Sequence, residues 1–307
     1  MTRAKARVSP DLRPTARELR WLAHIDRHGP QSSEFLYELT RDTHRCKDTS
    51  LRRLLALREA GYLRLPTQQE QIAKADFNPS VYDLTAKGFE YRSYHQPLER
   101  HARPTGHWWH GFWVSSVSSA IEISTARAGL EYIPAARILR IKDVPMAIPL
   151  RQGKLIPDQL FAIKYPDGYR AFALEVDRGT EPVRSRAARK SLQKSVRQYG
   201  KVLERKLHQR HYGLKSNLWV LYVFMSQARQ RQFLELLHPE GDRYLTATCQ
   251  PGFPTWATIG RVTRLVCAYQ ARQKWHNSFS SSGRRNSLLG EQLSIRFAYN
   301  PPCKAKN

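Results

Sequence analysis

The acidic side chains best placed for chemistry lie in residues 154–182, KLIPDQLFAIKYPDGYRAFALEVDRGTEP. Two strand-like apolar runs flank a Pro-Asp-Gly turn at residues 166–168, which predicts an antiparallel hairpin. Asp158 then lies near the start of the first strand and Glu175 near the end of the second, so the two are neighbours across the ladder. Two carboxylates at one end of a sheet can share a divalent cation such as Mg²⁺ or Mn²⁺, whose remaining ligands are phosphate oxygens and water.

Pro157-Asp158 and Glu175-Val176 resemble the two halves of the PD-(D/E)xK nuclease motif. The resemblance implies a metal-dependent DNA-cleaving site in which Asp158, Glu175 and the backbone carbonyl of Val176 bind the ion. The chain departs from the motif at Asp177, which stands where the motif has lysine. In that class the lysine orients the attacking water and stabilises the charge that builds on phosphate. Asp177 is therefore included among the catalytic candidates.

Two interpretations of the missing lysine stay open. In one, the role of the lysine has moved to the following helix, where Lys190 and Lys194 are the candidates, a migration that the resemblance allows. Alternatively the site is degenerate, needs no cofactor, and the fold only binds DNA. Glu122, on a helix expected from about residue 107 to 128, is a further candidate metal ligand.

Residues 184–215 are strongly basic, with eleven Lys or Arg against one acid, Glu204. We predict one long helix over residues 184–210, whose cations follow the phosphates of DNA. The DNA-binding candidates on this segment are Arg189, Lys190, Lys194, Arg197 and Lys201.

The N-terminal third predicts three helices, a strand, a loop, a second strand and a further helix. Thr15 and Glu18 form a capping box that starts the first helix. The third helix is expected over residues 47–60, and Gly61 ends it. Its predicted buried side chains are Leu51, Leu54, Leu55 and Leu57.

This order of elements resembles the winged helix-turn-helix superfamily, which implies that the third helix enters the major groove of DNA. Arg and Lys on that helix would supply phosphate contacts and read guanine. The predicted outward, DNA-contacting residues are Arg45, Lys47, Ser50, Arg52 and Arg53. A solvated helix face in a winged helix that binds only protein is the alternative.

His107 and His110 lie three residues apart at the start of the helix expected near residue 107, a spacing compatible with a metal pair. The neighbouring tryptophans favour packing and capping for both histidines. Cys46, Cys249, Cys267 and Cys303 form no CxxC pair. We therefore expect neither a zinc site nor a disulfide framework.

The composition favours a polyanionic partner. The chain has 307 residues, a formal net charge of +25 and a pI near 10.3, an excess that indicates nucleic acid before membrane. No apolar run approaches the roughly 20 residues of a membrane-spanning helix, and the basic N-terminus lacks the apolar core of a secretory signal. We expect a cytoplasmic protein; the oligomeric state stays open, a homodimer included.

The later elements complete the expected architecture. An apolar run at residues 218–224 predicts a buried strand, followed by a helix near residues 227–237 and a strand at residues 244–249. The fold class is α/β, with an α+β winged-helix N-terminal domain and a restriction-endonuclease-like mixed sheet flanked by helices. The expected boundaries are 12–96 for the winged helix, 97–106 for a linker, 107–270 for the nuclease-like domain and 271–307 for a flexible tail.

Taken together, "HGFW", "PDQLF", "ALEVDRGTEP" and the basic segment resemble the replication-relaxation family, whose members are encoded largely on plasmids and mobile elements. The resemblance covers roughly residues 12–240 and implies a DNA transaction. Two functions follow from it. One is a metal-dependent DNA nuclease; the other is a non-catalytic regulator of plasmid replication or transfer with a degenerate nuclease domain. A protein-binding adaptor accounts least well for the charge of +25.

Overall fold

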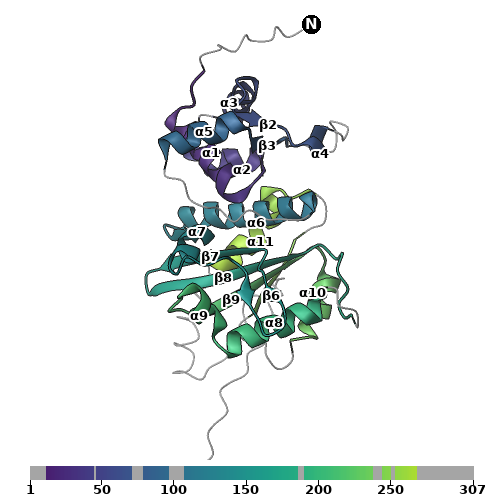
Figure 1. Cartoon of the computed structure of the whole chain (residues 1–307). Helices are drawn as coiled ribbons and strands as arrows, with labels where there is room; N and C mark the ends of the chain where they lie inside the picture. The colour runs from purple at the N-terminus through teal and green to yellow at the C-terminus, as the bar shows by residue number, and fades with distance from the viewer. Residues whose placement is uncertain are drawn as a thin grey trace, which may run out of the picture. The chain divides into compact units, whose positions relative to one another are not determined.

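The computed structural model of the chain describes residues 12–44, 46–70, 79–96, 107–185, 190–237, 244–249 and 253–267. These residues form a mixed α/β structure that divides into two compact units (Figure 1). Unit 1 contains residues 1–123 and 253–257, and unit 2 contains residues 124–252 and 258–307. The predicted linker at 97–106 and the predicted tail at 271–307 lie outside the described residues, so those predictions stay untested.

Unit 1 is built from short helices around a small sheet. Its elements are α1 (Ala16–His28), β1 (Gln31–Ser32), α2 (Ser33–Leu39), a 3₁₀ turn (Arg41–Thr43), α3 (Lys47–Glu59), β2 (Leu63–Arg64), α4 (Thr67–Glu70), β3 (Val81–Leu84), α5 (Ala86–His95) and the first part of α6 (Trp108–Arg127). The sheet has the order β1-β3-β2, and both pairs are antiparallel.

Local sequence explains where these helices begin and end. The carboxylate of Glu18 accepts a hydrogen bond of 2.8 Å from the backbone N–H of Thr15, as the predicted capping box requires. Gly61 follows α3 with φ of +78°, a conformation that glycine adopts at no steric cost. Gly88 is required for a different reason, because a Cβ there would lie 2.2 Å from the carbonyl oxygen of Tyr62.

The prediction for the buried face of α3 was half wrong. Leu54 and Leu57 are fully buried, but Leu51 and Leu55 are 36% and 44% exposed. Leu54, Leu57 and Ser50 share one stripe of the helix at spacings of three and four residues, and this stripe faces the core. Leu51 and Leu55 share the neighbouring stripe, which lies at the surface.

Unit 2 contains a five-stranded mixed sheet. Its elements are the end of α6, β4 (Glu131–Pro134), α7 (Ala135–Arg140), β5 (Ile148–Pro149), β6 (Lys154–Leu155), β7 (Gln159–Tyr165), β8 (Gly168–Asp177), α8 (Leu192–Glu204), α9 (Leu207–Tyr212), β9 (Leu218–Phe224), α10 (Gln227–Leu234), β10 (Tyr244–Thr248) and most of α11 (Trp256–Cys267). The strand order is β10-β9-β8-β7-β4, in which β8, β9 and β10 are parallel and β7 is antiparallel to both neighbours.

The predicted hairpin is confirmed by the pairing of β7 with β8, and the predicted buried strand by β9. Helices α8, α9 and α10 lie together along one face of the sheet (Figure 1). Ala171 and Ala173 of β8 point to that face and pack in one core with Tyr199 of α8. Because side chains alternate along a strand, Glu175 points toward α8 as well.

The predicted single basic helix over residues 184–210 is wrong. Helix α8 begins at Leu192, where the Ser191 hydroxyl accepts a hydrogen bond from the backbone N–H of Lys194. The helix ends at Glu204, and Lys206 adopts a left-handed backbone conformation with φ of +52° before α9 begins. The described basic residues of this segment are therefore divided between two helices and the residues that flank them.

Candidate active site

The hairpin brings Asp158 and Glu175 to the same end of the sheet. Gln159 pairs with Leu174, so Asp158, one residue earlier, lies beside Glu175, one residue later. The backbone N–H of Val176 donates a hydrogen bond of 2.8 Å to Oδ2 of Asp158. This bond fixes the Asp158 carboxylate against the end of β8.

Glu175 is a buried carboxylate with two identified contacts. Its Oε1 accepts a hydrogen bond of 2.6 Å from the Tyr199 hydroxyl of α8, and its Oε2 lies 3.7 Å from Nζ of Lys190. Burial and the negative charge of Asp158 raise the pKa of Glu175 to about 8, against the lowering effects of Lys190 and Tyr199. Two carboxylates that repel each other in a buried place are stabilised by a cation.

Lys190 supplies a positive charge to this pair. Its Nζ also lies 3.4 Å from Oε1 of Glu181, and its side chain is half exposed. Burial lowers the pKa of Lys190, but the charges of Glu175, Asp158 and Glu181 outweigh that effect and raise it above its ordinary value. Of the two candidate lysines, Lys190 is the one with an ion pair to Glu175 identified here; Lys194, which is also exposed, lies in the first turn of α8.

Asp177 does not join the pair. Its carboxylate accepts hydrogen bonds from the Arg229 guanidinium of α10, the shorter of them 2.7 Å, and from the backbone N–H of Gly179. The side chain is almost fully buried in this ion pair. Asp177 therefore has a structural partner at the position where the nuclease motif has lysine.

Glu122 has its identified partners within unit 1. It lies in unit 1, where one of its oxygens binds Arg27 and the other binds His28 of α1. Glu122 lies five residues before the end of α6, on the face of that helix that contacts α1.

The Asp158–Glu175 pair fits a hard divalent ion by the chemistry of its donors. Both groups offer carboxylate oxygens, and their mutual repulsion is what a bound cation would relieve. The backbone carbonyl of Val176 is at the same end of β8, although β8 also pairs with β9 at this residue. The two carboxylates are thus the donors that the structure itself brings together.

The raised pKa of Glu175 predicts a pH dependence of stability. The group has a pKa of about 8 in the folded chain, against 4.5 for an ordinary glutamate, so its protonated form favours the folded state. In metal-free buffer we expect the free energy of unfolding to fall as the pH rises from about 4.5 to about 8, because the unfolded chain loses this proton at a lower pH than the folded chain does. Denaturant unfolding of wild type and Glu175→Gln across that range measures the effect. Equal slopes in the two proteins would contradict it.

The predicted DNA-contacting residues of α3 divide into three groups. Lys47 and Arg52 are exposed, and Arg52 forms an ion pair of 3.1 Å with Asp48. Ser50 is fully buried, which contradicts its predicted outward position. Arg45 lies outside the described residues. Of the predicted DNA-contacting residues named so far, Lys47 and Arg52 therefore lie at the surface of α3, as predicted.

Arg53, the remaining α3 candidate, is largely committed to an internal ion pair. Its guanidinium donates to both oxygens of Glu18, at 2.5 and 3.0 Å, and the Glu18 side chain is fully buried. Burial raises the pKa of Glu18, but hydrogen bonds from Arg53 and Thr15 outweigh it and hold the pKa below its ordinary value. Arg53 therefore joins α3 to α1.

This ion pair predicts that Arg53→Met destabilises the protein, since it leaves the Glu18 charge buried without its partner. We expect a loss of about 3 kcal/mol in the free energy of unfolding. Arg52→Met, on the same helix, is the matched control, because an exposed pair contributes about 0.5 kcal/mol or less. Urea denaturation measures both, and equal losses would show that Arg53 has no special structural role.

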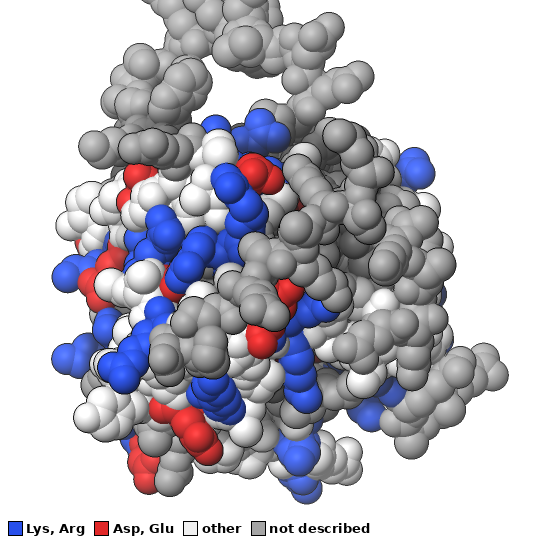
Figure 2. Space-filling model, turned by 90° about the horizontal axis from the view of Figure 1, so that it is seen from above, with Lys and Arg blue, Asp and Glu red and all other residues white. Residues whose placement is uncertain are grey.

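Basic side chains are numerous at the surface of the described chain. On α8, Arg197 and Lys201 are exposed, as predicted. Arg189 lies outside the described residues. Figure 2 shows Lys and Arg side chains spread across the face seen from above, with fewer acidic side chains between them.

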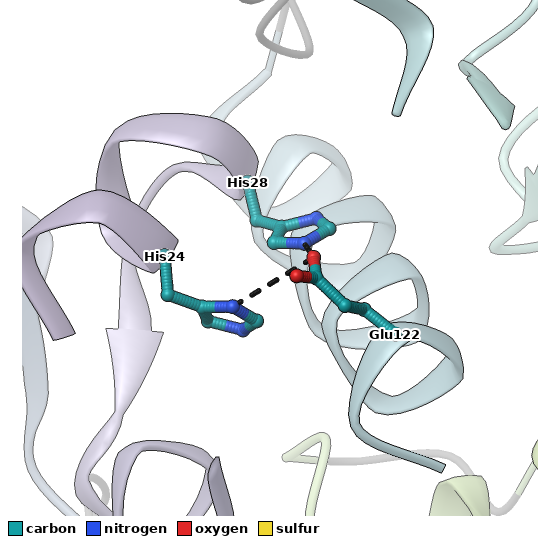
Figure 3. A group of neighbouring side chains, drawn as sticks. All are labelled: His24, His28 and Glu122. Atoms are coloured by element: carbon teal, nitrogen blue, oxygen red, sulfur yellow. Dashed lines mark hydrogen bonds and ion pairs between the residues drawn. The ribbon is translucent and has the colours of Figure 1, made fainter. Parts of the chain in front are cut away.

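The sequence interpretation missed one cluster. His24 and His28 of α1 and Glu122 of α6 place one ligand atom each within 4.8 Å of one another (Figure 3). The signal was present as two histidines four residues apart, a spacing that puts both on one face of a helix.

The fold and the site together define a mixed α/β protein that carries a buried glutamate and a partly buried aspartate beside a lysine. The chain belongs to the replication-relaxation family, which matches residues 22–218. Membership suggests a role in the replication or relaxation of a plasmid or another mobile element, and it implies interaction with DNA. No curated protein and no solved structure matches the chain. Among the described residues, we find no helix both long enough and apolar enough to span a bilayer.

Proposed function

We propose that this protein is a metal-dependent DNA nuclease whose active site is Asp158, Glu175 and Lys190. The observation that carries the proposal is the convergence of these three residues, from the start of β7, the end of β8 and the segment before α8. Lys190 Nζ lies 3.7 Å from Glu175 although 15 residues separate them along the chain. In this group, Lys190 takes the role of the lysine that the nuclease motif has at the position of Asp177.

The order of elements supports a PD-(D/E)xK-type fold for unit 2. In chain order unit 2 has the end of α6, β4, α7, the short β5–β6 pair, the β7–β8 hairpin, α8, α9, β9 and α10, with β8 and β9 parallel. Unit 1 supports a winged helix by its own order, three helices followed by β2, β3 and α5. We propose that the winged helix occupies residues 12–96 and that the nuclease-like domain lies within residues 107–270, although most of α6 at its start packs with unit 1 and the compact unit that carries the sheet begins at residue 124.

Each residue of the site has a distinct role in the proposed reaction. Asp158 and Glu175 would hold Mg²⁺ or Mn²⁺, which when bound polarises phosphate and makes bound water more acidic. Tyr199 orients Glu175 by its hydrogen bond of 2.6 Å. Lys190 carries a firmly held positive charge that stabilises the negative charge developing on the phosphate. Val176 fixes Asp158 through its backbone N–H.

The test is incubation of the full chain with supercoiled, linear and single-stranded DNA, each with Mg²⁺, with Mn²⁺ and with a chelator. We expect the protein to break DNA strands only when a divalent ion is present. Binding without cleavage under all these conditions would instead favour the second candidate, a non-catalytic regulator of replication or transfer. The Asp177–Arg229 ion pair favours the non-catalytic regulator, because the residue at the position of the motif's lysine takes part in a structural contact instead.

DNA binding should depend steeply on salt. The chain has a net charge of +25, and neutralising several phosphates releases their counterions. We expect the affinity for duplex DNA to fall by about 10³-fold between roughly 50 and 200 mM salt, and Arg52→Ala to reduce the log–log slope by about one. Fluorescence anisotropy titrations measure both values. An affinity that hardly responds to salt would contradict an electrostatic interface.

A further inference from the structure

A second group of ligand-type side chains lies entirely in unit 1. His24 and His28 come from one face of α1 and Glu122 from α6, and the three side chains point toward one another (Figure 3). The histidine side chains are 2% and 1% exposed and that of Glu122 is 16% exposed. His28 Nε2 lies 2.5 Å from Oε2 of Glu122, and His24 Nδ1 lies 3.8 Å from the same oxygen.

Each of the three side chains has a second partner that fixes its orientation. The other ring nitrogen of His24, Nε2, lies 2.7 Å from the hydroxyl of Ser119. The other ring nitrogen of His28, Nδ1, lies 2.8 Å from the hydroxyl of Ser118. Arg27 binds the other oxygen of Glu122. Partners of this kind are typical of metal ligands, because they set the tautomer and the direction of the donor atom.

The hydrogen bonds of Ser118 decide which nitrogen of His28 carries a proton. The Ser118 hydroxyl donates its only proton to the Ser115 carbonyl, at 3.1 Å. It therefore accepts from Nδ1–H of His28. A neutral His28 then presents the lone pair of Nε2 to a carboxylate oxygen 2.5 Å away. Two electron-pair donors so close together require a cation between them, which is either a proton or a metal ion.

We propose that His24, His28 and Glu122 form a binding site for a transition-metal dication of the Zn²⁺ class. The ligand atoms are His24 Nδ1, His28 Nε2 and Glu122 Oε2, a nitrogen and oxygen set that suits zinc. Tetrahedral zinc with bonds of about 2.0–2.1 Å separates its ligands by about 3.3 Å, a value between the 2.5 and 3.8 Å found here. Binding requires the His28–Glu122 contact to open by less than about 1 Å.

The ion would fasten α1 to α6 and so contribute to the stability of unit 1. Three protein ligands leave one position of a tetrahedral ion for water. The expectation of no zinc site rested on the spacing of the cysteines, and this site uses none of them. It is also independent of the acidic pair in unit 2, so either site can fail its test without the other.

The experiment uses the full chain carrying Asp158→Asn, so that the acidic pair of unit 2 does not add to the metal count. The protein is stripped with a chelator, dialysed and titrated with Zn²⁺ by calorimetry, and separately loaded with Co²⁺ for absorption spectroscopy. We expect one equivalent of tightly bound Zn²⁺, a raised melting temperature, and Co²⁺ bands of tetrahedral nitrogen and oxygen ligation. Absence of a stoichiometric site, or Co²⁺–thiolate bands that assign the ion to cysteine, would overturn the proposal.

Substitutions then locate the site. His24→Gln and Glu122→Gln should each weaken Zn²⁺ binding more than about 100-fold, and Ser119→Ala should weaken it about 10- to 100-fold. His95→Gln is the matched control, because His95 is an exposed histidine of α5 in the same unit. Circular dichroism checks folding, and Ser119→Ala stays informative where a ligand variant does not fold. The assignment would be contradicted if Ser119→Ala bound Zn²⁺ as tightly as wild type and if His24→Gln and Glu122→Gln lost no more Zn²⁺ affinity than His95→Gln.

Discussion

Asp158→Asn and Glu175→Gln should each abolish metal-dependent cleavage while leaving DNA binding nearly unchanged. Each substitution removes a negative metal ligand at almost constant volume. The introduced asparagine keeps an oxygen that can accept from the Val176 N–H, and the introduced glutamine keeps one that can accept from Tyr199. We expect the cleavage rate to fall by more than the roughly 10²–10³-fold that accompanies loss of a single charge-stabilising group. Initial rates on supercoiled plasmid and anisotropy titrations on duplex DNA measure the two effects.

Two substitutions serve as controls for this prediction. Asp167→Asn changes a half-exposed acid in the turn of the same hairpin, where it pairs with Arg170, and should leave cleavage unchanged. Asp177→Asn should lower stability by weakening the Arg229 pair, yet retain cleavage per folded molecule. Retained cleavage in Asp158→Asn, or a loss of equal size in Asp167→Asn, would remove the acidic pair from the active site.

Lys190→Ala should reduce the cleavage rate by about 10²–10³-fold, because it removes the ammonium that we propose stabilises charge on phosphate. The same substitution removes a charge that lowers the pKa of Glu175. The pKa of Glu175 should therefore be higher in Lys190→Ala, and the cleavage activity of this variant should begin to rise at a higher pH than that of wild type. This shift distinguishes a charge in the site from a general loss of fold.

Lys194→Ala is the matched control for Lys190. Both lysines lie close together in the sequence, but Lys194 is exposed on the first turn of α8 and its backbone already takes part in the Ser191 cap. We expect its substitution to weaken DNA binding slightly and to leave the rate at saturating DNA unchanged. A larger rate loss in Lys194→Ala than in Lys190→Ala would reverse the assignment.

The sequence predicted those parts of the fold that depend on local patterns. The hairpin follows from two apolar runs around a Pro-Asp-Gly turn, and its register places Asp158 beside Glu175 without further information. The capping box at Thr15 and the glycine after α3 are equally local. By contrast, β4 and the β5–β6 pair were missed, because strands of two to four residues carry too little pattern to be recognised.

Side-chain partners distant in the sequence were not predictable in the same way. Arg53 and Ser50 had the charge and polarity of surface residues, and only the packing of α3 against α1 shows that one binds Glu18 and the other is buried. Helical spacing alone does not say which stripe faces the core. The long-range cluster of His24 and Glu122 is a similar case, since 98 residues separate its members along the chain.

The proposed metal-dependent nuclease site of Asp158, Glu175 and Lys190 is tested by the rate at which wild-type protein nicks supercoiled plasmid as the concentration of Mg²⁺ or Mn²⁺ is increased. Each point is paired with Glu175→Gln protein purified in the same way. We expect nicking by wild-type protein to rise to saturation with the metal and to stop on addition of a chelator, and we expect none from the variant. Wild-type protein that binds the plasmid but never nicks it, or nicking that Glu175→Gln retains, would show that these residues are not a metal-dependent nuclease site.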